Sequence, residues 1–482
     1  MSELPDRVLV LGLARSGRAA ALALARRGAT VVAVDRSTEL DVSELAKAGI
    51  ELRLGLESVR LLEGAGLLVK SPGVPSSSPL VQAARKRRIP VWSEVELASR
   101  LFSNPLLGVT GTNGKKTTTE LLGAFFRAAG RKVEVAGNVG RAICDLDGEL
   151  DPESWIVCEF SSFQLEDIER LRLHVAVLLN VEPDHLDRHG SLEAYRRVKR
   201  RLAELVDPDG ALVLNMDDPV VSQYASLGTA AVVPYSRGRP HAGGLGLEDG
   251  WIVAAGVAPT AIAGGGAAGG PTSGVIGRIL PISELAIPGE HNVSNALAAV
   301  AAALLFGVAP DAIRGAAATF TGVEHRLEQV AIVDGVRFIN DSQGTQPDAV
   351  IAALHAFPRP LVLIAGGRDK GVDLSGLGPV VAEKADAAVL IGESGYKLAT
   401  MFGASGMTQV ELATSLERAV IRADQIARDL LRRRGGTGPA TVLLSPAAAS
   451  FDMFVDYADR GRAFKAAVAA VAARRRAEES EP

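Results

Sequence analysis

Short apolar runs alternate along the chain with Ala- and Leu-rich segments of helical periodicity, and glycine or proline separates one from the next. A continuous apolar run bounded by turn residues is typical of a buried strand, and its alternation with helices predicts βαβ units that build parallel sheets. The opening elements are predicted as a strand, a tight turn, a helix and a second strand at residues 7–11, 12–17, 18–27 and 30–34.

The same pattern recurs in two further blocks. A short strand is predicted at residues 67–70, and a strand, loop and helix follow at 107–110, 111–115 and 117–129. The remaining predicted elements are strands at 155–158, 176–179, 337–339, 360–365, 387–391 and 441–444 and a helix at 292–306.

A chain of 482 residues has room for about three domains at roughly 150 residues each. The pattern predicts an α/β fold with domains at residues 1–103, 104–322 and 323–482. A Gly/Ala-rich stretch at 254–277 predicts a flexible hairpin or surface insertion. The charged tail at 474–482 is predicted to fray.

Composition narrows the class of protein. The formal net charge of -4 argues against a nucleic-acid-binding protein, which usually presents a basic face. Two cysteines are too few for a disulfide framework and fit a reducing compartment. The first apolar run is too short for a signal peptide or a membrane span. We therefore expect a cytoplasmic protein without membrane insertion.

A phosphate-binding loop is predicted between the strand at 107–110 and the helix that follows it. The loop reads Gly111-Thr112-Asn113-Gly114-Lys115. Its glycines allow backbone N–H groups to turn inward, the helix N-terminus favours an anion, and the lysine can reach the outer phosphates. The match to the general P-loop is incomplete, because Val109 and Lys116 stand where glycine and Ser or Thr are usual.

The string from Gly108 to Lys115 resembles the nucleotide loop of Mur ligases and folylpolyglutamate synthases. Further segments resemble those of Mur ligases in the family's own order, and the one at 159–166 resembles the segment that marks the members adding D-glutamate. These segments lie at residues 159–166, 180–187, 195–199, 289–295, 324–326, 366–371 and 445–450.

The resemblance implies an enzyme with a Rossmann-like N-terminal domain, a central P-loop ATPase domain and a Rossmann-like C-terminal domain. It implies ATP-dependent addition of D-glutamate to UDP-N-acetylmuramoyl-L-alanine through an acyl phosphate, in peptidoglycan precursor synthesis. ATP and two Mg²⁺ ions are the expected cofactors, the substrates are the expected partners, and a monomer is expected.

The resemblance also implies site residues. Lys115, Glu159, His185 and Lys199 are expected to be catalytic. The ATP set is Gly111, Thr112, Asn113, Gly114, Lys115, Lys116, Thr117, Asn292, Asn295, Arg326 and Asp341. The UDP-substrate set is Arg15, Ser16, Asp35, Arg36, Ser71, Pro72, Gly73, Asn138 and Ser161. The D-glutamate set is Thr345, Lys370, Ser450 and Tyr457.

Metal binding is expected at Thr117, Glu159, His185 and, if it is carbamylated, Lys199. Mg²⁺ prefers carboxylate, water and phosphate oxygens, which makes Glu159 a suitable ligand on chemical grounds. A histidine is a less typical Mg²⁺ ligand, so the expectation that His185 binds metal rests on the resemblance. A carbamate would convert the cationic Lys199 into an anion.

The sequence departs from the family at two places that bear on activity. Lys116 stands where the family has a hydroxyl that coordinates Mg²⁺, and an ammonium there would repel the metal at close range. Gln343 stands where family members often have lysine. These departures leave open a relative that binds substrates but is catalytically impaired.

The sequence also leaves two competing functions open. The turn at 12–17 with Asp35 after the next strand imitates the dinucleotide fingerprint of an NAD-dependent oxidoreductase, although Ala14 replaces its middle glycine. That hypothesis leaves the phosphate loop and Lys370 unexplained. The other hypothesis is a different Mur-type or folylpolyglutamate-type ligase, and the segment at 159–166 and Asp35 argue against it.

Overall fold

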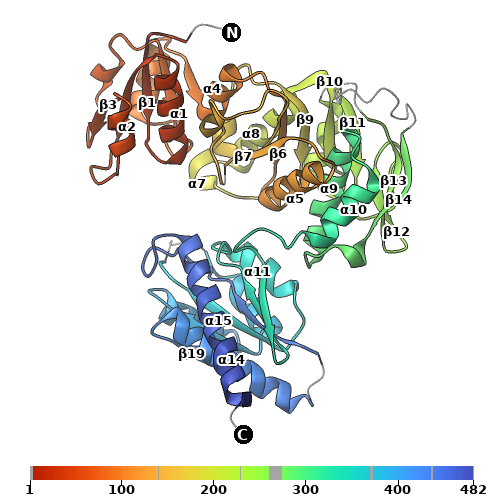
Figure 1. Cartoon of the computed structure of the whole chain (residues 1–482). Coiled ribbons are helices and arrows are strands. Elements are labelled where there is room, and N and C mark those ends of the chain that lie inside the picture. The colour runs from red at the N-terminus through yellow and green to blue at the C-terminus, as the bar shows by residue number, and fades with distance from the viewer. Residues whose placement is uncertain are drawn as a thin grey trace. The chain divides into compact units, whose positions relative to one another are not determined.

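The computed structural model describes residues 4–138, 140–227, 230–259, 274–369, 373–435 and 438–480. The chain forms two compact units. The first comprises residues 1–285 and 291–320, and the second comprises residues 286–290 and 321–482. Most of the second unit is the part coloured cyan to blue in Figure 1.

The first unit opens with a parallel five-stranded sheet in the order β3-β2-β1-β4-β5. The parallel pairing is what the opening βαβ pattern predicts, and the strand order is of the doubly wound kind. Its strands are β1 (Arg7–Leu11), β2 (Thr30–Asp35), β3 (Glu51–Leu54), β4 (Leu67–Lys70) and β5 (Val91–Ser93). Its helices are α1 (Arg15–Arg26), α2 (Ser43–Lys47), α3 (Pro79–Lys86) and α4 (Glu94–Leu101), with a 3-10 turn η1 (Val59–Leu62).

A nine-stranded sheet forms the rest of the first unit, in the order β14-β13-β12-β11-β10-β9-β6-β8-β7. The pairs from β7 to β12 are parallel, and β12, β13 and β14 pair in antiparallel fashion. The strands are β6 (Leu106–Thr110), β7 (Val133–Gly137), β8 (Trp155–Glu159), β9 (Leu173–Leu178), β10 (Val206–Asn215), β11 (Ala231–Tyr235), β12 (Leu245–Glu248), β13 (Trp251–Val257) and β14 (Val275–Pro281). The helical elements are α5 (Lys115–Ala128), α6 (Ser162–Leu165), α7 (Leu186–His189), α8 (Leu192–Glu204), α9 (Glu290–Leu305), α10 (Pro310–Thr319), η2 (Ile143–Leu146), η3 (Val221–Ser226) and η5 (Ile282–Glu284).

The second unit holds a six-stranded sheet in the order β15-β16-β20-β17-β18-β19, parallel except for the β15–β16 edge pair. Its strands are β15 (Glu328–Val333), β16 (Val336–Asn340), β17 (Leu361–Gly366), β18 (Ala387–Ile391), β19 (Val410–Leu412) and β20 (Ala440–Leu444). Its helices are α11 (Pro347–His355), α12 (Leu377–Lys384), α13 (Gly395–Ala404), α14 (Leu416–Arg433) and α15 (Tyr457–Ser480).

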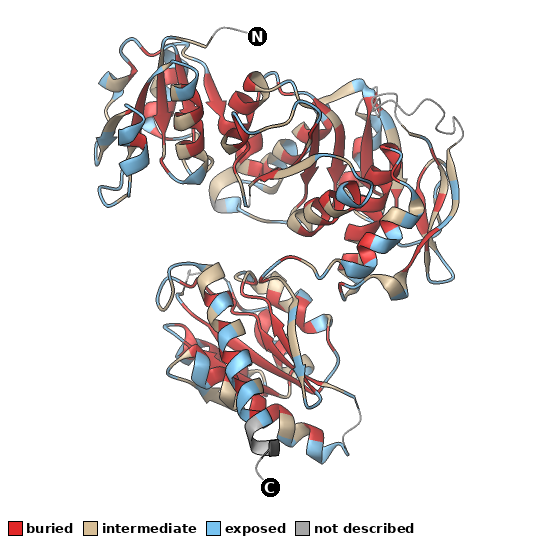
Figure 2. Cartoon of the chain, viewed as in Figure 1, coloured by how far each residue is buried: buried red, intermediate tan, exposed pale blue. Residues whose placement is uncertain are grey.

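Burial follows the predicted pattern within each unit. The central strands of the three sheets are buried, and the outer faces of the helices are exposed (Figure 2). The three parallel-rich sheets confirm the predicted α/β class, while the residue bounds of the three domains stay a prediction. The hairpin predicted in the Gly/Ala-rich stretch is present as β13 and β14, and residues 260–273 between them lie outside the described part.

The prediction of a frayed tail is wrong for residues 474–480, because α15 continues to Ser480. Arg475 is buried and anchors the helix. Its guanidinium donates to the carbonyl of Val333 at 2.7 Å and to Asp334 at 2.9 Å, and it also pairs with the buried Asp424. A local charge pattern cannot predict these contacts, because the partners of Arg475 lie far from it in the sequence.

Cys144 and Cys158 are free, buried thiols. Burial raises the pKa of both Cys144 and Cys158 well above the ordinary value, so both stay protonated and unreactive. Within the described ranges, the helices are all too short or too polar to cross a membrane.

Candidate active site

The predicted phosphate loop lies at the carboxyl end of β6, in the centre of the nine-stranded sheet. α5 begins at Lys115, two residues earlier than predicted, because Gly114 takes a left-handed turn with φ of +83°. A Cβ atom at Gly114 would lie 2.2 Å from Asn295 Oδ1 on α9. The loop and the predicted adenine residue Asn295 therefore lie in contact, and only glycine fits between them.

The lysine of the loop folds back over it. Lys115 Nζ donates to the carbonyls of Gly111 at 3.0 Å and Thr112 at 2.7 Å. The amine is thus held at the loop mouth, where a bound phosphate would meet a positive charge. The hydroxyl of Thr117 lies on a buried residue in the first turn of α5, and the side chain of Lys116 is half-buried.

Three residues outside the predicted site set brace the loop, and they lie in the segments at 180–187 and 195–199 that resemble those of Mur ligases. The backbone N–H of Asn113 donates to Asn180 Oδ1 at 2.7 Å, and its side-chain amide donates to Glu182 at 3.0 Å. The hydroxyls of Thr112 and Tyr195 lie 3.0 Å apart. Asn180 follows β9, the neighbour of β6, so its position after a central strand was the available signal.

Lys199 on α8 lies directly beneath the loop. Its side chain is 1% exposed, and its Nζ donates to Gly111 O at 2.8 Å and to Thr110 Oγ1 at 3.0 Å. Burial, and then the Lys115 ammonium, lower the pKa of Lys199 well below its ordinary value, while the carboxylates of Asp184 and Glu159 act in the opposite direction. A buried amine with a lowered pKa is neutral more often, and neutral amines are the nucleophilic form.

Glu159 ends β8, the strand beside β6, and is buried. The side-chain amide of Asn138 donates to Glu159 Oε1 at 2.9 Å, and the backbone N–H of Asn138 donates to Glu159 O at 2.9 Å. Gly137 permits this approach, because a Cβ there would lie 2.4 Å from Glu159 O. The structure thus brings Asn138 and Glu159 together at the same sheet edge as the loop.

His185 is the most open of the four predicted catalytic residues, with a side chain that is 43% exposed. Its backbone is left-handed at φ of +51°, its Nε2 lies 3.4 Å from Asp184, and its ring centroid lies 4.8 Å from that of Phe163. The predicted substrate residue Ser161 is buried and caps α6, accepting from Gln164 N at 3.2 Å.

The residues present fit a magnesium ion that arrives with a nucleotide. Among the described residues, no group of three or more His, Cys, Asp and Glu side chains could hold a metal ion by itself. Mg²⁺ is usually held by one or two carboxylates plus phosphate and water, and the buried Glu159 carboxylate beside the phosphate loop suits that mode.

The predicted UDP residues gather at the carboxyl edge of the five-stranded sheet. A Cβ at Gly12 would lie 2.9 Å from Ser71 Cβ, so the turn after β1 and the loop after β4 are in contact. Asp35 at the end of β2 accepts from Leu13 N at 2.6 Å and Ser37 N at 2.9 Å. Arg36 is exposed and pairs with Glu57 at 2.8 Å.

Arg15 and Ser16 open α1 above this edge. The Arg15 guanidinium donates to the carbonyl of Asn138 at 3.2 Å and also to that of Gly140. The predicted diphosphate end of the first sheet therefore touches the loop that carries Asn138. Within the first unit, predicted substrate residues of the two sheets are therefore in contact, through Arg15 and Asn138.

The second unit holds the rest of the predicted set. Asp341 follows β16, and Ser445 Oγ donates to its carboxylate at 2.7 Å. Burial raises the pKa of Asp341 to about 6, against the opposing effect of Arg326 and the Ser445 hydrogen bond. Ser450 is buried, Thr345 and Tyr457 are half-buried, and Lys370 lies outside the described residues.

Arg460 is a further buried residue that the sequence did not reveal. Its guanidinium donates to Ser342 Oγ at 3.0 Å and to Ser342 O at 2.9 Å, which fixes the loop between Asp341 and Thr345. Nothing in the local sequence distinguishes it from the other arginines of α15.

Three family models match the chain in order. They are the Mur ligase MurD-like N-terminal domain at residues 6–93, the Mur ligase middle domain at 109–303 and the Mur ligase glutamate ligase domain at 325–434. The chain belongs to the Mur ligase family. The hypothesis of an NAD-dependent oxidoreductase is therefore wrong, and the fingerprint-like turn at 12–17 is the first βα turn of a Mur ligase N-terminal domain.

Two relatives that match nearly the full chain are both named as D-glutamate ligases. UDP-N-acetylmuramoylalanine--D-glutamate ligase of Caldanaerobacter subterraneus subsp. tengcongensis is 39% identical over 96% of this chain and 98% of its own. The enzyme of the same name from Acidobacterium capsulatum is 41% identical over 95% of each chain.

Two solved structures, a Mur ligase and a folylpolyglutamate synthase, share the fold. UDP-N-acetylmuramate-alanine ligase MurC from Thermotoga maritima matches with a TM-score of 0.57 at 19% identity, covering 96% of this chain and 99% of its own. Folylpolyglutamate synthase from Mycobacterium tuberculosis matches with a TM-score of 0.56 at 17% identity, covering 77% of this chain and 92% of its own. At these identities the likeness shows the fold alone.

Proposed function

We propose that this Mur ligase adds D-glutamate to UDP-N-acetylmuramoyl-L-alanine at the expense of ATP, a step of peptidoglycan precursor synthesis. The observation that carries the proposal is the sequence identity of 39% and 41%, over nearly the whole chain, to enzymes named for that reaction. The phosphate loop with Lys115, Glu159 and Lys199 around it supports the ATP-dependent half of the chemistry.

The first step forms an acyl phosphate. A carboxylate oxygen of the substrate attacks the γ-phosphorus of ATP, the bond to the β–γ bridging oxygen breaks, and ADP leaves. Such a transfer needs positioning and charge neutralisation more than covalent help from the protein. Lys115, held at the loop mouth by two carbonyls, supplies positive charge where the phosphates lie.

The second step forms the amide. The neutral amine of D-glutamate attacks the acyl carbon, inorganic phosphate leaves, and the amine nitrogen loses a proton. Thr345, Lys370, Ser450 and Tyr457 are the residues proposed to hold D-glutamate, and Arg326 and Asp341 join the nucleotide set from the second unit. Asn292 and Asn295 on α9 are the proposed adenine contacts.

Two Mg²⁺ ions are proposed for the loaded enzyme. Glu159 and Thr117 would hold one, and His185 and a carbamylated Lys199 would hold the other. When bound, Mg²⁺ neutralises charge on the phosphate oxygens. The UDP moiety is assigned to Arg15, Ser16, Asp35, Arg36 and the Ser71-Pro72-Gly73 loop, with Asn138 and Ser161 toward the muramoyl end. We propose that the enzyme acts as a cytoplasmic monomer.

Phosphate release tests this proposal. The protein is assayed with ATP, Mg²⁺ and UDP-N-acetylmuramoyl-L-alanine, together with D-glutamate, L-glutamate, meso-diaminopimelate or L-lysine. Release that requires both the muramoyl nucleotide and D-glutamate supports the assignment. Release with a different amino acid keeps the family and overturns the substrate.

A second candidate is a binding relative with impaired turnover, favoured by Lys116 in the first turn of α5 and by Gln343. Lys116→Thr restores the hydroxyl and removes an ammonium near the metal. For an impaired relative, the wild-type protein binds the muramoyl nucleotide without releasing phosphate, and the variant gains activity. An active wild-type enzyme excludes this candidate.

A further inference from the structure

Four charged side chains meet inside the first unit, between the five-stranded sheet and the nine-stranded sheet. They are Lys70, Glu166, Asp167 and Arg188, which we name the charge junction. Their side chains are 1%, 11%, 4% and 13% exposed, so water screens them little. The four comprise two positive and two negative groups, and Asp167 also pairs with Arg85 at 2.6 Å. None of the four belongs to the predicted site set.

The pairing geometry is tight. Lys70 Nζ lies 3.0 Å from Glu166 Oε2 and 2.8 Å from Asp167 Oδ2. Arg188 binds Glu166 in bidentate fashion, with Nε 3.1 Å from Oε1 and Nη2 2.8 Å from Oε2. Bidentate arginine–carboxylate pairs fix direction as well as distance.

The same groups hold the loop that follows β4. Lys70 Nζ donates to Val74 O at 3.1 Å, and Arg188 Nη2 donates to Val74 O at 2.8 Å and to Pro72 O at 3.4 Å. Ser76 Oγ donates to Glu166 Oε2 at 2.9 Å. Residues 71–76 are thus tied to the junction at three points, and Pro72 and Val74 are held through their backbone.

Arg188 extends the junction toward the nucleotide side. It lies on α7, three residues after His185, and its guanidinium sits 4.9 Å above the ring of Phe163, which also packs against His185. One cation therefore contacts both the loop after β4 and the segment at 163–185. A rearrangement of the loop after β4 would therefore shift Arg188 and disturb the segment at 163–185, and the reverse also holds.

Glu166 stays ionised at neutral pH. Burial acts to raise the pKa of Glu166, but the hydrogen bond from Arg188 and the charge of Lys70 outweigh it and hold that pKa at about 2. The ionised Glu166 holds Lys70 and Arg188, which are in turn hydrogen-bonded to the backbone of the loop, and the cluster thereby anchors that loop.

We propose that Lys70, Glu166 and Arg188 are positioning residues for the UDP moiety of the substrate, because they hold the Ser71-Pro72-Gly73 loop in its binding conformation. The inference rests on the proposed function. None of the three is assigned a contact with the reacting atoms.

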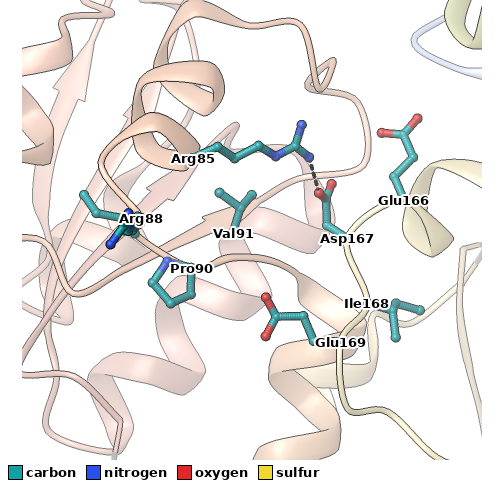
Figure 3. Close-up of a pocket in the computed structure, with 9 residues that line it drawn as sticks. Arg85, Arg88, Pro90, Val91, Glu166, Asp167, Ile168 and Glu169 are labelled. Atoms are coloured by element: carbon teal, nitrogen blue, oxygen red, sulfur yellow. Dashed lines mark hydrogen bonds and ion pairs between the residues drawn. The ribbon is translucent and has the colours of Figure 1, made fainter.

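Glu169 offers a matched control. It lies on the same segment as Glu166, spans the same two sheets through the indole of Trp92 at 3.2 Å, and makes no described contact with residues 71–76. Glu166, Asp167 and Glu169 line a pocket of about 410 Å³. Figure 3 shows Asp167 paired to Arg85 in this pocket. Glu169→Gln removes the charge of Glu169 from its contact with Trp92 and leaves the contacts of residues 71–76 intact.

The test compares Lys70→Met, Glu166→Gln, Arg188→Lys and Glu169→Gln with the wild-type full chain. Calorimetry gives Kd for UDP-N-acetylmuramoyl-L-alanine and for ATP, kinetics give KM and kcat, and hydrogen exchange of residues 71–76 is followed without ligand. For Lys70→Met and Glu166→Gln, Kd and KM for the muramoyl nucleotide rise about tenfold or more, because partners are left uncompensated. Kd for ATP and kcat at saturation stay within about threefold. Arg188→Lys, which keeps the charge but loses the fork, shows a smaller rise.

The exchange data separate this inference from the proposed function. Faster exchange confined to residues 71–76 in the three junction variants, with Glu169→Gln unchanged, supports the anchor. Unchanged exchange and Kd, or equal losses for ATP and the muramoyl nucleotide, overturn it. A wild-type protein that fails to bind the muramoyl nucleotide at all contradicts the proposed function, and exchange then still decides whether the junction holds the loop.

Discussion

Lys199 shows how a single residue acquires its chemistry from its surroundings. In the sequence it is one of several cations in a basic run, but the structure buries it under the phosphate loop with two oxygen acceptors. Its role could be inferred only from the family resemblance, because burial is not visible in a run of charges. Lys115 at the start of α5 and Glu159 at the end of β8, by contrast, stand at positions where the sequence pattern alone indicates a site.

We expect Lys199 to carry a carbamate, because burial lowers the pKa of its amine and so favours the neutral form, which can add to CO₂ with loss of one proton. Protein incubated with ¹³C-bicarbonate should show a carbamate carbon by NMR, and Lys199→Met should not. Loss of this side chain should lower kcat/KM by at least about 100-fold, because even the outer partners of metal ligands are worth roughly 10–100-fold and the carbamate is proposed as a ligand itself. A fully active Lys199→Met enzyme would contradict this expectation.

Glu94 predicts a pH effect on stability. It opens α4, is fully buried, accepts from Cys144 N at 2.6 Å, and its Oε2 has no hydrogen-bond partner among the described residues. Burial raises the pKa of Glu94 from 4.5 to about 7, despite the opposing hydrogen bonds from Cys144. The native state therefore binds the proton more tightly than the unfolded chain, and this contribution is full below pH 4.5 and lost as pH rises through about 7.

Glu94→Gln should stabilise the first unit at pH 8 by roughly 1–3 kcal/mol, because a buried charge is removed. At pH 5 the gain should nearly vanish. Urea unfolding at the two pH values measures the difference, with Glu153→Gln on the surface as the control. An equal effect at both pH values would show that Glu94 is not the titrating group.

At the scale of elements, the apolar runs predicted the strands well and the helix starts less well. β1, β4 and β18 have the predicted bounds, because each is buried along its whole length or nearly so. α1 and α5 begin three and two residues earlier than predicted, at Arg15 and Lys115, because their first turns carry polar residues of the binding loops. The end of α15 was missed because its stability comes from distant partners.

Arg475 should therefore matter to the second unit. Arg475→Ala leaves the buried Asp424 without that partner, and breaking such a pair costs about 3–5 kcal/mol. Chemical denaturation of the full chain should show the corresponding transition at lower denaturant. Arg432→Ala, which removes the exposed pair with Asp429, should cost less than about 1 kcal/mol. Similar losses in both variants would contradict the anchoring role.

For the whole molecule, the proposed site is divided between the two compact units. The phosphate loop, Glu159 and Lys199 belong to the first, while Asp341, Thr345 and Ser450 belong to the second. The sequence predicted that ATP and D-glutamate bind to different domains, and the bounds of the three domains stay a prediction. It did not predict the charge junction, since Lys70 and Glu166 are 96 residues apart and nothing in the motif at 159–166 indicates that Glu166 pairs with Lys70.

Turnover should require the two units to close on each other, because ATP and D-glutamate are assigned to different units. Small-angle scattering should show a smaller radius of gyration with a non-hydrolysable ATP analogue, the muramoyl nucleotide and D-glutamate than without ligands. The nucleotide alone should give a smaller change. An unchanged radius with all three ligands bound would contradict closure.

Because the two native thiols are buried, the predicted closure can be followed with dyes attached to introduced cysteines. Maleimide dyes react with accessible thiolates, and Cys144 and Cys158 offer neither access nor thiolate. Ile276 in the first unit and Tyr396 in the second are 81% and 77% exposed. A chain with Ile276→Cys and Tyr396→Cys can thus be labelled at two points without removing a native cysteine, and energy transfer between the dyes would report each catalytic cycle in single molecules.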